Sequence, residues 1–481
     1  MPPPTAPAPD FDLVVVGLGS AGITAAEFAA GLGLRVAAVE RSRPGGDCLW
    51  TGCVPSKAII ASARAAHVMR TADRVGIRAV APEIDLAMVW RRARAVQADI
   101  ARTDDDPRHF LELGIELVAG QARVSGANEV AVTQPDGSTR TLCTRFVLLC
   151  TGSNPVVPDI AGLAAADCLT SENLFTIDAP PSSLVIIGGG AMGTEMAQAL
   201  TRLGVRVTVF ERLPSLLTGE EPSLVERLTD VVTAEGATVH CSADVRRVER
   251  GADGSVTMHA IVGNDGRQVT VTAGAVLVAA GRRANTAGLG LEAVGVAVGP
   301  DGVVVDERGR TSVRTVYAAG DMVGGLQLTH AAGHEAVQAV RDMFFPGKGG
   351  AGRSIPWCTF TDPELARIGL TSTEAEELHG TDTDVWFGEF ANNDRARTDA
   401  RTEGAIVIVT AKGKVVGAHV LAPAAGEMVH ELALAVREGL RIDELAGLVH
   451  VYPTFASSIG RLATEAAFER AQRLKWMLKK R

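Results

Sequence analysis

The chain has 481 residues, of which 46% are hydrophobic and 52 are glycine, and its net charge is −9. This length predicts several domains rather than a single core, and the composition is typical of an α/β protein. The negative charge argues against a nucleic-acid-binding surface. No apolar run approaches the roughly 18 residues of a membrane span, so we expect neither nucleic acid nor a membrane as a partner.

The first residues, MPPPTAPAPD, lack the basic and apolar regions of a signal peptide, and we expect a short disordered lead and a cytoplasmic protein. The basic end, LKWMLKKR, is interpreted as a solvated tail. Seven scattered cysteines in a reducing compartment disfavour a disulfide framework.

One pattern occurs twice, at FDLVVVGLGSAG (11–22) and at SSLVIIGGGAMG (182–193). In each copy an apolar β-branched run leads into Gly-x-Gly-x-x-Gly, an Ala-rich helical pattern, and a second strand that ends in an acid at the same spacing. Such glycines allow the backbone to approach a pyrophosphate, the helix N-terminus supplies N–H donors, and the acid can bind a ribose 2′-hydroxyl. The alternative is two ordinary βαβ units with glycine-rich turns.

The repeat therefore predicts two Rossmann-like domains, each with one dinucleotide. The residues expected at the first site are Gly17, Gly19, Ser20, Ala21, Gly22, Glu40 and Arg41. Those expected at the second site are Gly188, Gly190, Gly193 and Glu211. The acids favour a nucleotide without a 2′-phosphate, and hence NADH over NADPH. An arginine follows each acid, so Arg212 adds little to the choice.

Three further buried strands end at candidate binding residues. FVLLCTGSNPVVP (146–158) leads to Thr151 and Gly152, AVLVAAGRRANT (275–286) leads to Gly281, and TVYAAGDMVGG (315–325) leads to Gly320 and Asp321. At such a strand end, Asp321 could bind a polyol, although it could also be a turn aspartate.

The segment GGDCLWTGCVPSK (45–57) holds Cys48 and Cys53 directly after the first repeat, and Gly46 and Asp47 are further binding candidates. A zinc half-site would need a second Cys or His pair nearby, and unpaired core cysteines are a further alternative. The placement favours a redox-active disulfide. Because a regular helix holds residues five apart too far for a disulfide, we expect a distortion at Gly52 and a helix from about Pro55.

That geometry would put Cys53 near a helix N-terminus, which favours a thiolate, and Lys57 could stabilise the same charge. From about residue 352 the pattern changes to IPWCTFTDPELARIGL, a hairpin signal at TAKGKV and two helices, without a glycine-rich loop. We expect an α+β domain that packs against a second subunit.

These motifs resemble the class I pyridine nucleotide–disulfide oxidoreductases, the family of dihydrolipoamide dehydrogenase, glutathione reductase and mercuric reductase, and most closely its mercuric reductase-like members. The resemblance covers about residues 11–465. It implies an FAD-binding domain (11–153), an NAD(P)-binding domain (154–281), a second FAD or central part (282–350) and a C-terminal dimerisation domain (351–481), hence a homodimer.

The resemblance also implies residue roles. The first repeat would bind FAD and the second NAD(P)H, and Asp321 would hold the ribityl chain. Lys57 would lie near the flavin, paired with Glu195. Cys53 would be the thiol beside the flavin and Cys48 the thiol that meets the acceptor. Electrons would pass from NAD(P)H through FAD to the Cys48–Cys53 disulfide and on to a disulfide or a soft metal ion such as Hg(II).

The C-terminal segment departs from the family's His-x-His-Pro-Thr-x-x-Glu motif, because HVYPTFAS places Tyr452 at the catalytic histidine and Ser457 at the glutamate. A phenol titrates near ~10, against ~6.5 for imidazole, and is a poor base at neutral pH. Dihydrolipoamide dehydrogenase activity is therefore disfavoured, although Tyr452 stays a catalytic candidate. Mercuric reductases share the tyrosine, but their C-terminal cysteine pair is missing here. The alternatives are a diaphorase or quinone reductase, in which reduced FAD donates directly, and a flavin-binding protein without turnover.

Overall fold

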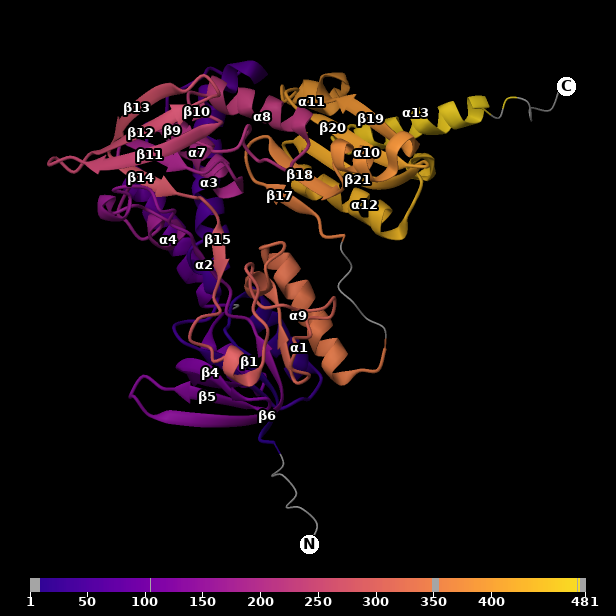
Figure 1. Ribbon diagram of the computed structural model, residues 1–481. Helices are drawn as coiled ribbons and strands as arrows, with labels where there is room; N and C mark the ends of the chain where they lie inside the picture. Colours follow the sequence, from indigo (N-terminus) through magenta and orange to yellow (C-terminus); the bar gives the residue numbers. More distant parts are fainter. Residues whose placement is uncertain (1–8, 104, 348–353, 474, 476–481) are drawn as a thin grey trace, which may run out of the picture.

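The computed structural model describes residues 9–103, 105–347, 354–473 and 475. The predicted lead at residues 1–8 and nearly all of the predicted tail lie outside these ranges. Figure 1 shows three blocks: an N-terminal unit, a middle unit beside it, and a C-terminal unit that packs against the middle one.

The N-terminal unit is a parallel sheet that continues into an antiparallel meander. The sheet order is β3-β2-β1-β6, and β16 pairs with the second half of β6 on the side away from β1. The first half of β6 pairs with β5, which in turn pairs with β4. Its strands are β1 (Phe11–Val16), β2 (Val36–Glu40), β3 (Glu116–Ala119), β4 (Gln121–Gly126), β5 (Glu129–Thr133), β6 (Thr139–Leu149) and β16 (Val316–Ala318). Its helices are α1 (Ser20–Gly31), α5 (Pro107–Glu112) and α9 (Thr329–Phe344).

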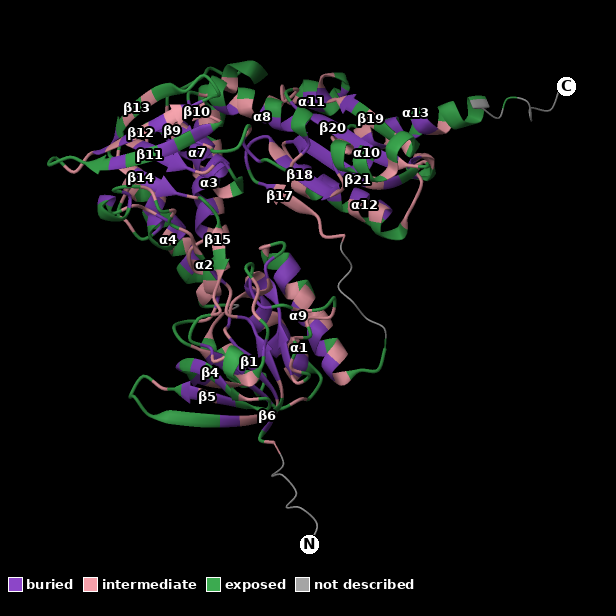
Figure 2. Cartoon of the chain, in the orientation of Figure 1, coloured by how far each residue is buried: buried purple, intermediate pink, exposed green. Residues whose placement is uncertain are grey.

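Strand β1 is apolar from Leu13 to Val16 because both of its faces are covered there. Leu13 and Val15 pack in a cluster with α1 and α9, whereas Val14 and Val16 pack in a second cluster with the meander. Figure 2 shows the buried centre of this unit and its exposed hairpin tips. The sheet thus separates a helical layer from an antiparallel layer.

The middle unit repeats this design. Its parallel order is β10-β9-β8-β14, and β11, β12 and β13 form a separate meander. The strands are β8 (Ser183–Ile187), β9 (Arg206–Phe210), β10 (Thr238–His240), β11 (Ala243–Arg250), β12 (Val256–Val262), β13 (Arg267–Ala273) and β14 (Ala275–Val278), and the helices are α7 (Ala191–Arg202) and α8 (Pro222–Ala234). Leu184 and Ile186 face the helices, and Val185 and Ile187 face the meander. The two predicted Rossmann-like domains are confirmed.

Two strands and four helices connect these units. The strands β7 (Ser153–Pro155) and β15 (Arg282–Ala284) pair antiparallel, so the chain leaves and re-enters the N-terminal unit along one ribbon. The helices are α2 (Gly46–Trp50), α3 (Cys53–Arg70), α4 (Leu86–Ala101) and α6 (Ser171–Leu174). Apolar residues of α3, α4 and α7 share one core cluster, which joins the redox segment to the middle unit.

The C-terminal unit is the predicted α+β structure, an antiparallel sheet ordered β17-β18-β21-β20-β19. Its strands are β17 (Trp357–Thr359), β18 (Glu364–Gly369), β19 (Thr383–Glu389), β20 (Ala405–Ala411) and β21 (Lys414–Ala422), and its helices are α10 (Ser372–His379), α11 (Asp394–Thr398), α12 (Ala425–Glu438) and α13 (Ser457–Arg473). Ile406 and Ile408 pack with α12, whereas Val407 and Val409 belong to the cluster of α7 and α8. Among the described residues, no helix has the length and hydrophobicity to cross a bilayer.

A buried charge cluster lies where the three elements α3, α7 and β18 meet. The carboxylate of Asp362, 3% exposed, accepts a hydrogen bond from Arg202 Nη1 at 2.7 Å and another from Arg401. Arg202 also pairs with Glu235 at 2.6 Å. The Arg202 carbonyl accepts a bond from Arg70 of α3 at 2.5 Å.

Removing one partner of such a buried pair leaves an uncompensated charge and costs about 3–5 kcal/mol. We therefore expect Asp362→Ala to lower the free energy of unfolding by about 3 kcal/mol, measured by urea unfolding followed by tryptophan fluorescence. The control is Asp399→Ala, which removes a half-exposed carboxylate paired with Arg395 at 2.7 Å and should change stability by less than about 1 kcal/mol. Equal effects of the two substitutions would contradict the structural role of the cluster.

Candidate redox and dinucleotide sites

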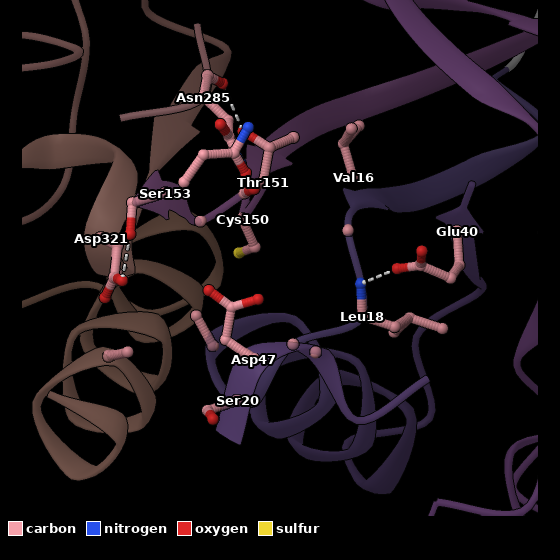
Figure 3. A pocket seen from close by; sticks show the side chains of 18 of the residues that line it. Val16, Leu18, Ser20, Glu40, Asp47, Cys150, Thr151, Ser153, Asn285 and Asp321 are labelled. Atoms are coloured by element: carbon pink, nitrogen blue, oxygen red, sulfur yellow. Dashed lines mark hydrogen bonds between the residues drawn. The ribbon is translucent and has the colours of Figure 1, made fainter. Parts of the chain in front are cut away.

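A first cavity opens at the carboxyl ends of β1 and β6, where the sequence predicts the first dinucleotide (Figure 3). Most of the predicted residues line it. They are Gly17, Gly19, Ser20, Ala21, Glu40, Arg41, Gly46, Asp47, Cys48, Cys53, Thr151, Gly152, Gly320 and Asp321. The structure thus brings together residues from five separate segments of the chain.

The first turn of α1 has the form of a phosphate cradle. Its N-cap, Gly19, makes no side-chain capping bond, so the first N–H groups of the helix have no side-chain partner. Gly17 has φ +95°, and a Cβ there would lie 2.5 Å from the Cys150 carbonyl oxygen. Gly22 does not line the cavity; a Cβ there would lie 1.8 Å from Gly17 O, so this glycine lets the helix approach the strand.

Glu40 lies at the end of β2, where a ribose of a bound dinucleotide is expected. Its carboxylate accepts a hydrogen bond from the backbone N–H of Leu18 at 2.8 Å (Figure 3). It accepts another from the backbone N–H of Ser42 at 2.8 Å. These bonds orient the acid against the glycine turn. An uncapped helix start, glycine positions that exclude side chains and an oriented acid fit FAD, the group that the family resemblance implies.

On the opposite wall of this cavity, the predicted Asp321 and Asp47 are joined by Ser153 and Arg282, which the sequence analysis did not single out. The Asp321 carboxylate accepts a bond from Ser153 Oγ at 2.6 Å (Figure 3). Arg282 donates to Ser153 Oγ at 2.7 Å and forms an ion pair with Asp47 across the cavity. The motif AAGRRANT predicts Gly281 as a binding residue, but its sequence does not indicate which of the two arginines points into the cavity.

The redox segment is brought to the cavity by close backbone contact. Gly46, with φ +52°, lies so near the turn of α1 that a Cβ there would be 2.6 Å from Gly19 Cα. The short helix α2 carries Cys48, and Gln97 of α4 donates to the carbonyls of Leu49 and Trp50 at 2.9 and 2.8 Å. The predicted break at Gly52 is present, but α3 begins at Cys53, two residues before the expected Pro55, because Gly52 serves as its N-cap.

Both thiols are free in this structure, and their pKa values are shifted in opposite directions. A hydrogen bond from Cys48 is the main cause that lowers the pKa of Cys53 to about 6, with further contributions from Thr329 and Lys57. The same contact, together with burial, raises the pKa of Cys48. A thiolate therefore forms more readily on Cys53 than on Cys48.

Lys57 lines neither cavity and instead joins α3 to α7. Its Nζ donates to Glu195 Oε2 at 2.9 Å, and lies 4.5 Å from the Phe360 ring centroid. The other oxygen of Glu195, Oε1, accepts a bond from the Phe360 N–H at 2.8 Å. The pairing of Lys57 with Glu195, implied by the resemblance, is present. It lies between α3 and α7, and neither residue lines a cavity.

A second cavity lies at the carboxyl ends of β8 and β14 and is lined by Gly188, Gly190, Glu211 and Gly281. Gly193 lies behind it, where a Cβ would be 2.0 Å from Gly188 O. Glu211 accepts bonds from the N–H groups of Gly189 and Leu213 at 2.5 and 2.7 Å, as Glu40 does in the first site. Gln327 lines both cavities, so the two sites adjoin at the segment that leads into α9.

Tyr452 lies on the C-terminal unit, lines neither cavity and is 71% exposed. Its hydroxyl donates to Asp394 Oδ2 at 2.9 Å, which raises the pKa of the phenol. Ser457 donates to the Thr454 carbonyl at 2.7 Å and so takes no part in a dyad. Within the described ranges, no group of three or more His, Cys, Asp or Glu side chains could hold a metal ion.

Comparison with known proteins agrees with this geometry. Residues 11–336 match the model of the pyridine nucleotide-disulphide oxidoreductases, and residues 355–463 match the dimerisation domain of the same proteins. The chain is 34% identical to dihydrolipoyl dehydrogenase of Chlorobaculum tepidum, over 97% of this chain and 98% of the relative. It is 36% identical to mercuric reductase of Streptomyces lividans, over 84% of each.

A solved structure similar to this one is the Cu(II) complex of RclA, an HOCl-induced flavoprotein disulfide reductase from Escherichia coli. The TM-score is 0.83 at 26% identity, covering 95% of this chain and 99% of RclA. The two glycine turns, the paired thiols and the matched domains lead to one assignment: the chain belongs to the pyridine nucleotide-disulphide oxidoreductase family and is an oxidoreductase.

Proposed function

We propose that the protein passes electrons from NAD(P)H through FAD to Cys48 and Cys53, and from there to a thiol-reactive acceptor, either a disulfide or a soft metal ion. The glycine turn of α1 and Glu40 would hold FAD, which would supply the electron transfer between the nicotinamide and the disulfide. The observation that carries the proposal is the thiol pair itself, which lines the same cavity as the glycine turn of α1 and in which the pKa of Cys53 is lowered.

The residues around Cys48 and Cys53 support a different role for each sulfur. Cys53 begins α3, whose N-terminus stabilises a negative charge, and Lys57 lowers its pKa further. Cys48 keeps its proton until an acceptor arrives. With a disulfide acceptor, Cys48 loses that proton and bonds to one acceptor sulfur while the other leaves as a thiolate; Cys53 then bonds to Cys48 and releases the first sulfur.

The C-terminal segment favours a soft metal ion over a dithiol or a disulfide. A disulfide acceptor needs an acid to protonate the departing thiolate. Tyr452 bears a phenol with a raised pKa and Ser457 lacks a carboxylate. A soft metal ion reacts with thiolates and leaves no sulfur to protonate. The relatives include a mercuric reductase and the RclA structure is a Cu(II) complex, so Hg(II) and Cu(II) are the first acceptors to assay.

The structure and the comparisons also support proposals on oligomeric state, compartment, domain boundaries and nucleotide preference. The match to a dimerisation domain supports a homodimer, and the seven free cysteines suit the reducing cytoplasm. The paired strands β7 and β15 support domain boundaries near residues 153 and 282. The oriented carboxylate of Glu211 supports NADH over NADPH, because it would repel a 2′-phosphate.

Substituting Cys48 separates the proposed thiol path from direct donation by reduced FAD. We expect Cys48→Ala to lower NADH-dependent reduction of Hg(II) or of a small disulfide by at least about 100-fold, because no interchange thiol remains. Quinone reduction should stay within about twofold, since it needs only the flavin. Cys168→Ala, which removes a thiol that lines neither cavity, is the matched control. Full metal and disulfide reduction in Cys48→Ala would favour the diaphorase alternative.

The nucleotide preference is tested at Glu211. We expect the wild-type protein to have a higher kcat/KM for NADH than for NADPH, and Glu211→Gln to shift that ratio toward NADPH by about tenfold, the worth of one hydrogen bond to a charged group. Steady-state kinetics with both nucleotides measure it. Glu226→Gln, which neutralises an exposed acid on α8, should leave the ratio unchanged. A wild-type preference for NADPH would overturn the assignment.

A further inference from the structure

The first cavity fits FAD, whose pyrophosphate is negatively charged, yet more acids than bases line it. Its charged lining residues are four carboxylates and two arginines: Glu40, Asp47, Glu172, Asp321, Arg41 and Arg282. Arg41 is exposed and follows Glu40, at the end of the cavity where a ribose is expected. Among the described lining residues, Arg282 is therefore the cation on the wall formed by Asp47 and Asp321. The charge that a pyrophosphate meets at this wall depends on that arginine.

Asp47 lies beside the phosphate cradle at the start of α1. The preceding residue, Gly46, packs so closely on the turn that a Cβ there would lie 2.6 Å from the Cα of Gly19, the N-cap of α1. Figure 3 shows the Asp47 carboxylate pointing into the cavity. A carboxylate at this position repels a pyrophosphate held by the N–H groups of α1, because like charges interact strongly where water is partly excluded.

The guanidinium of Arg282 is fixed to the cavity wall without help from Asp47. Its Nε donates to Ser153 Oγ at 2.7 Å and its Nη2 donates to the Ser153 carbonyl at 2.9 Å. Its Nη1 lies 3.5 Å from Ser171 Oγ of α6. From this place Nη2 reaches the Asp47 carboxylate, and Nε lies 3.6 Å from Asp321 Oδ2. The cation thus stands between two acids from distant parts of the chain, in an orientation that β7 and α6 set.

We propose that Arg282 is the counter-charge of the first cavity: it neutralises Asp47 and so lets an acidic wall accept the pyrophosphate of FAD. The proposal rests on the proposed function, which requires FAD in this cavity. In this role Arg282 acts through its charge, and Asp47 opposes cofactor binding. A different role for the same ion pair is a strap across the cavity, in which both residues retain the cofactor. The two roles differ in the sign of the effect expected from Asp47.

The affinity for FAD measures this sign and needs no turnover. The purified holoenzyme of each variant is serially diluted, and the FAD released at equilibrium is followed by its fluorescence. We expect Arg282→Gln to raise the dissociation constant at least about tenfold and Asp47→Asn to lower it about threefold, because the first removes the counter-charge and the second the repulsion. The double variant Asp47→Asn/Arg282→Gln should return to within about threefold of the wild type.

Two further variants separate the charge of Arg282 from its packing. Arg282→Lys keeps the positive charge and should stay within about threefold of the wild type. Arg283→Gln removes the neighbouring arginine of β15, which is exposed and lines neither cavity. This matched control should change the dissociation constant by less than about twofold, because exposed charges contribute little.

An affinity for FAD that falls or stays the same in Asp47→Asn overturns the proposal, and a fall favours the strap. An unchanged affinity in Arg282→Gln, or an equal loss in Arg283→Gln, overturns it as well. If Arg282→Gln does not fold, Asp47→Asn decides by itself, since the Asp47 side chain is 51% exposed and the amide has nearly the same shape. A protein with the expected affinities whose cysteines carry no electrons would contradict the proposed function and leave the role of Arg282 standing.

Discussion

The contact between helices α3 and α7 is the constraint on which the two sites depend. At one end Lys57 pairs with Glu195, and at the other Arg70 donates to the carbonyl of Arg202. Each helix begins beside a cavity, α3 with Cys53 and α7 with the second glycine turn. Because the helices are held together at both ends, their contact places the redox thiols relative to the second nucleotide cavity.

The Lys57–Glu195 ion pair between these helices also determines how much positive charge acts on Cys53. Glu195 is nearly buried and both of its oxygens are used, one by Lys57 and one by the Phe360 backbone. The carboxylate thus fixes the lysine and also weakens its field at Cys53. What remains to stabilise a thiolate on Cys53 is local: the hydrogen bond from Cys48, the start of α3 and the Thr329 hydroxyl.

Features encoded by local pattern were predictable from the sequence, and features made by long-range contact were not. The glycine turns, Glu40 and Glu211 follow from spacing within one βαβ unit, because the turn geometry itself demands glycine. The inward turn of Arg282 depends on Asp47, more than two hundred residues away in the chain. The same holds for Thr329 against Cys53. Helix α3 starts at Cys53 rather than at about Pro55, because Gly52 takes the N-cap position and Pro55 lies within the first turn.

The central claim is that Cys53 lies in the electron path, beside the flavin. It is tested most directly by reducing the yellow protein anaerobically with NADH and recording the visible spectrum of the wild type and of Cys53→Ser. We expect a long-wavelength thiolate-to-flavin charge-transfer band in the wild type that is absent from Cys53→Ser. A spectrum that passes directly to reduced flavin in both proteins would contradict it.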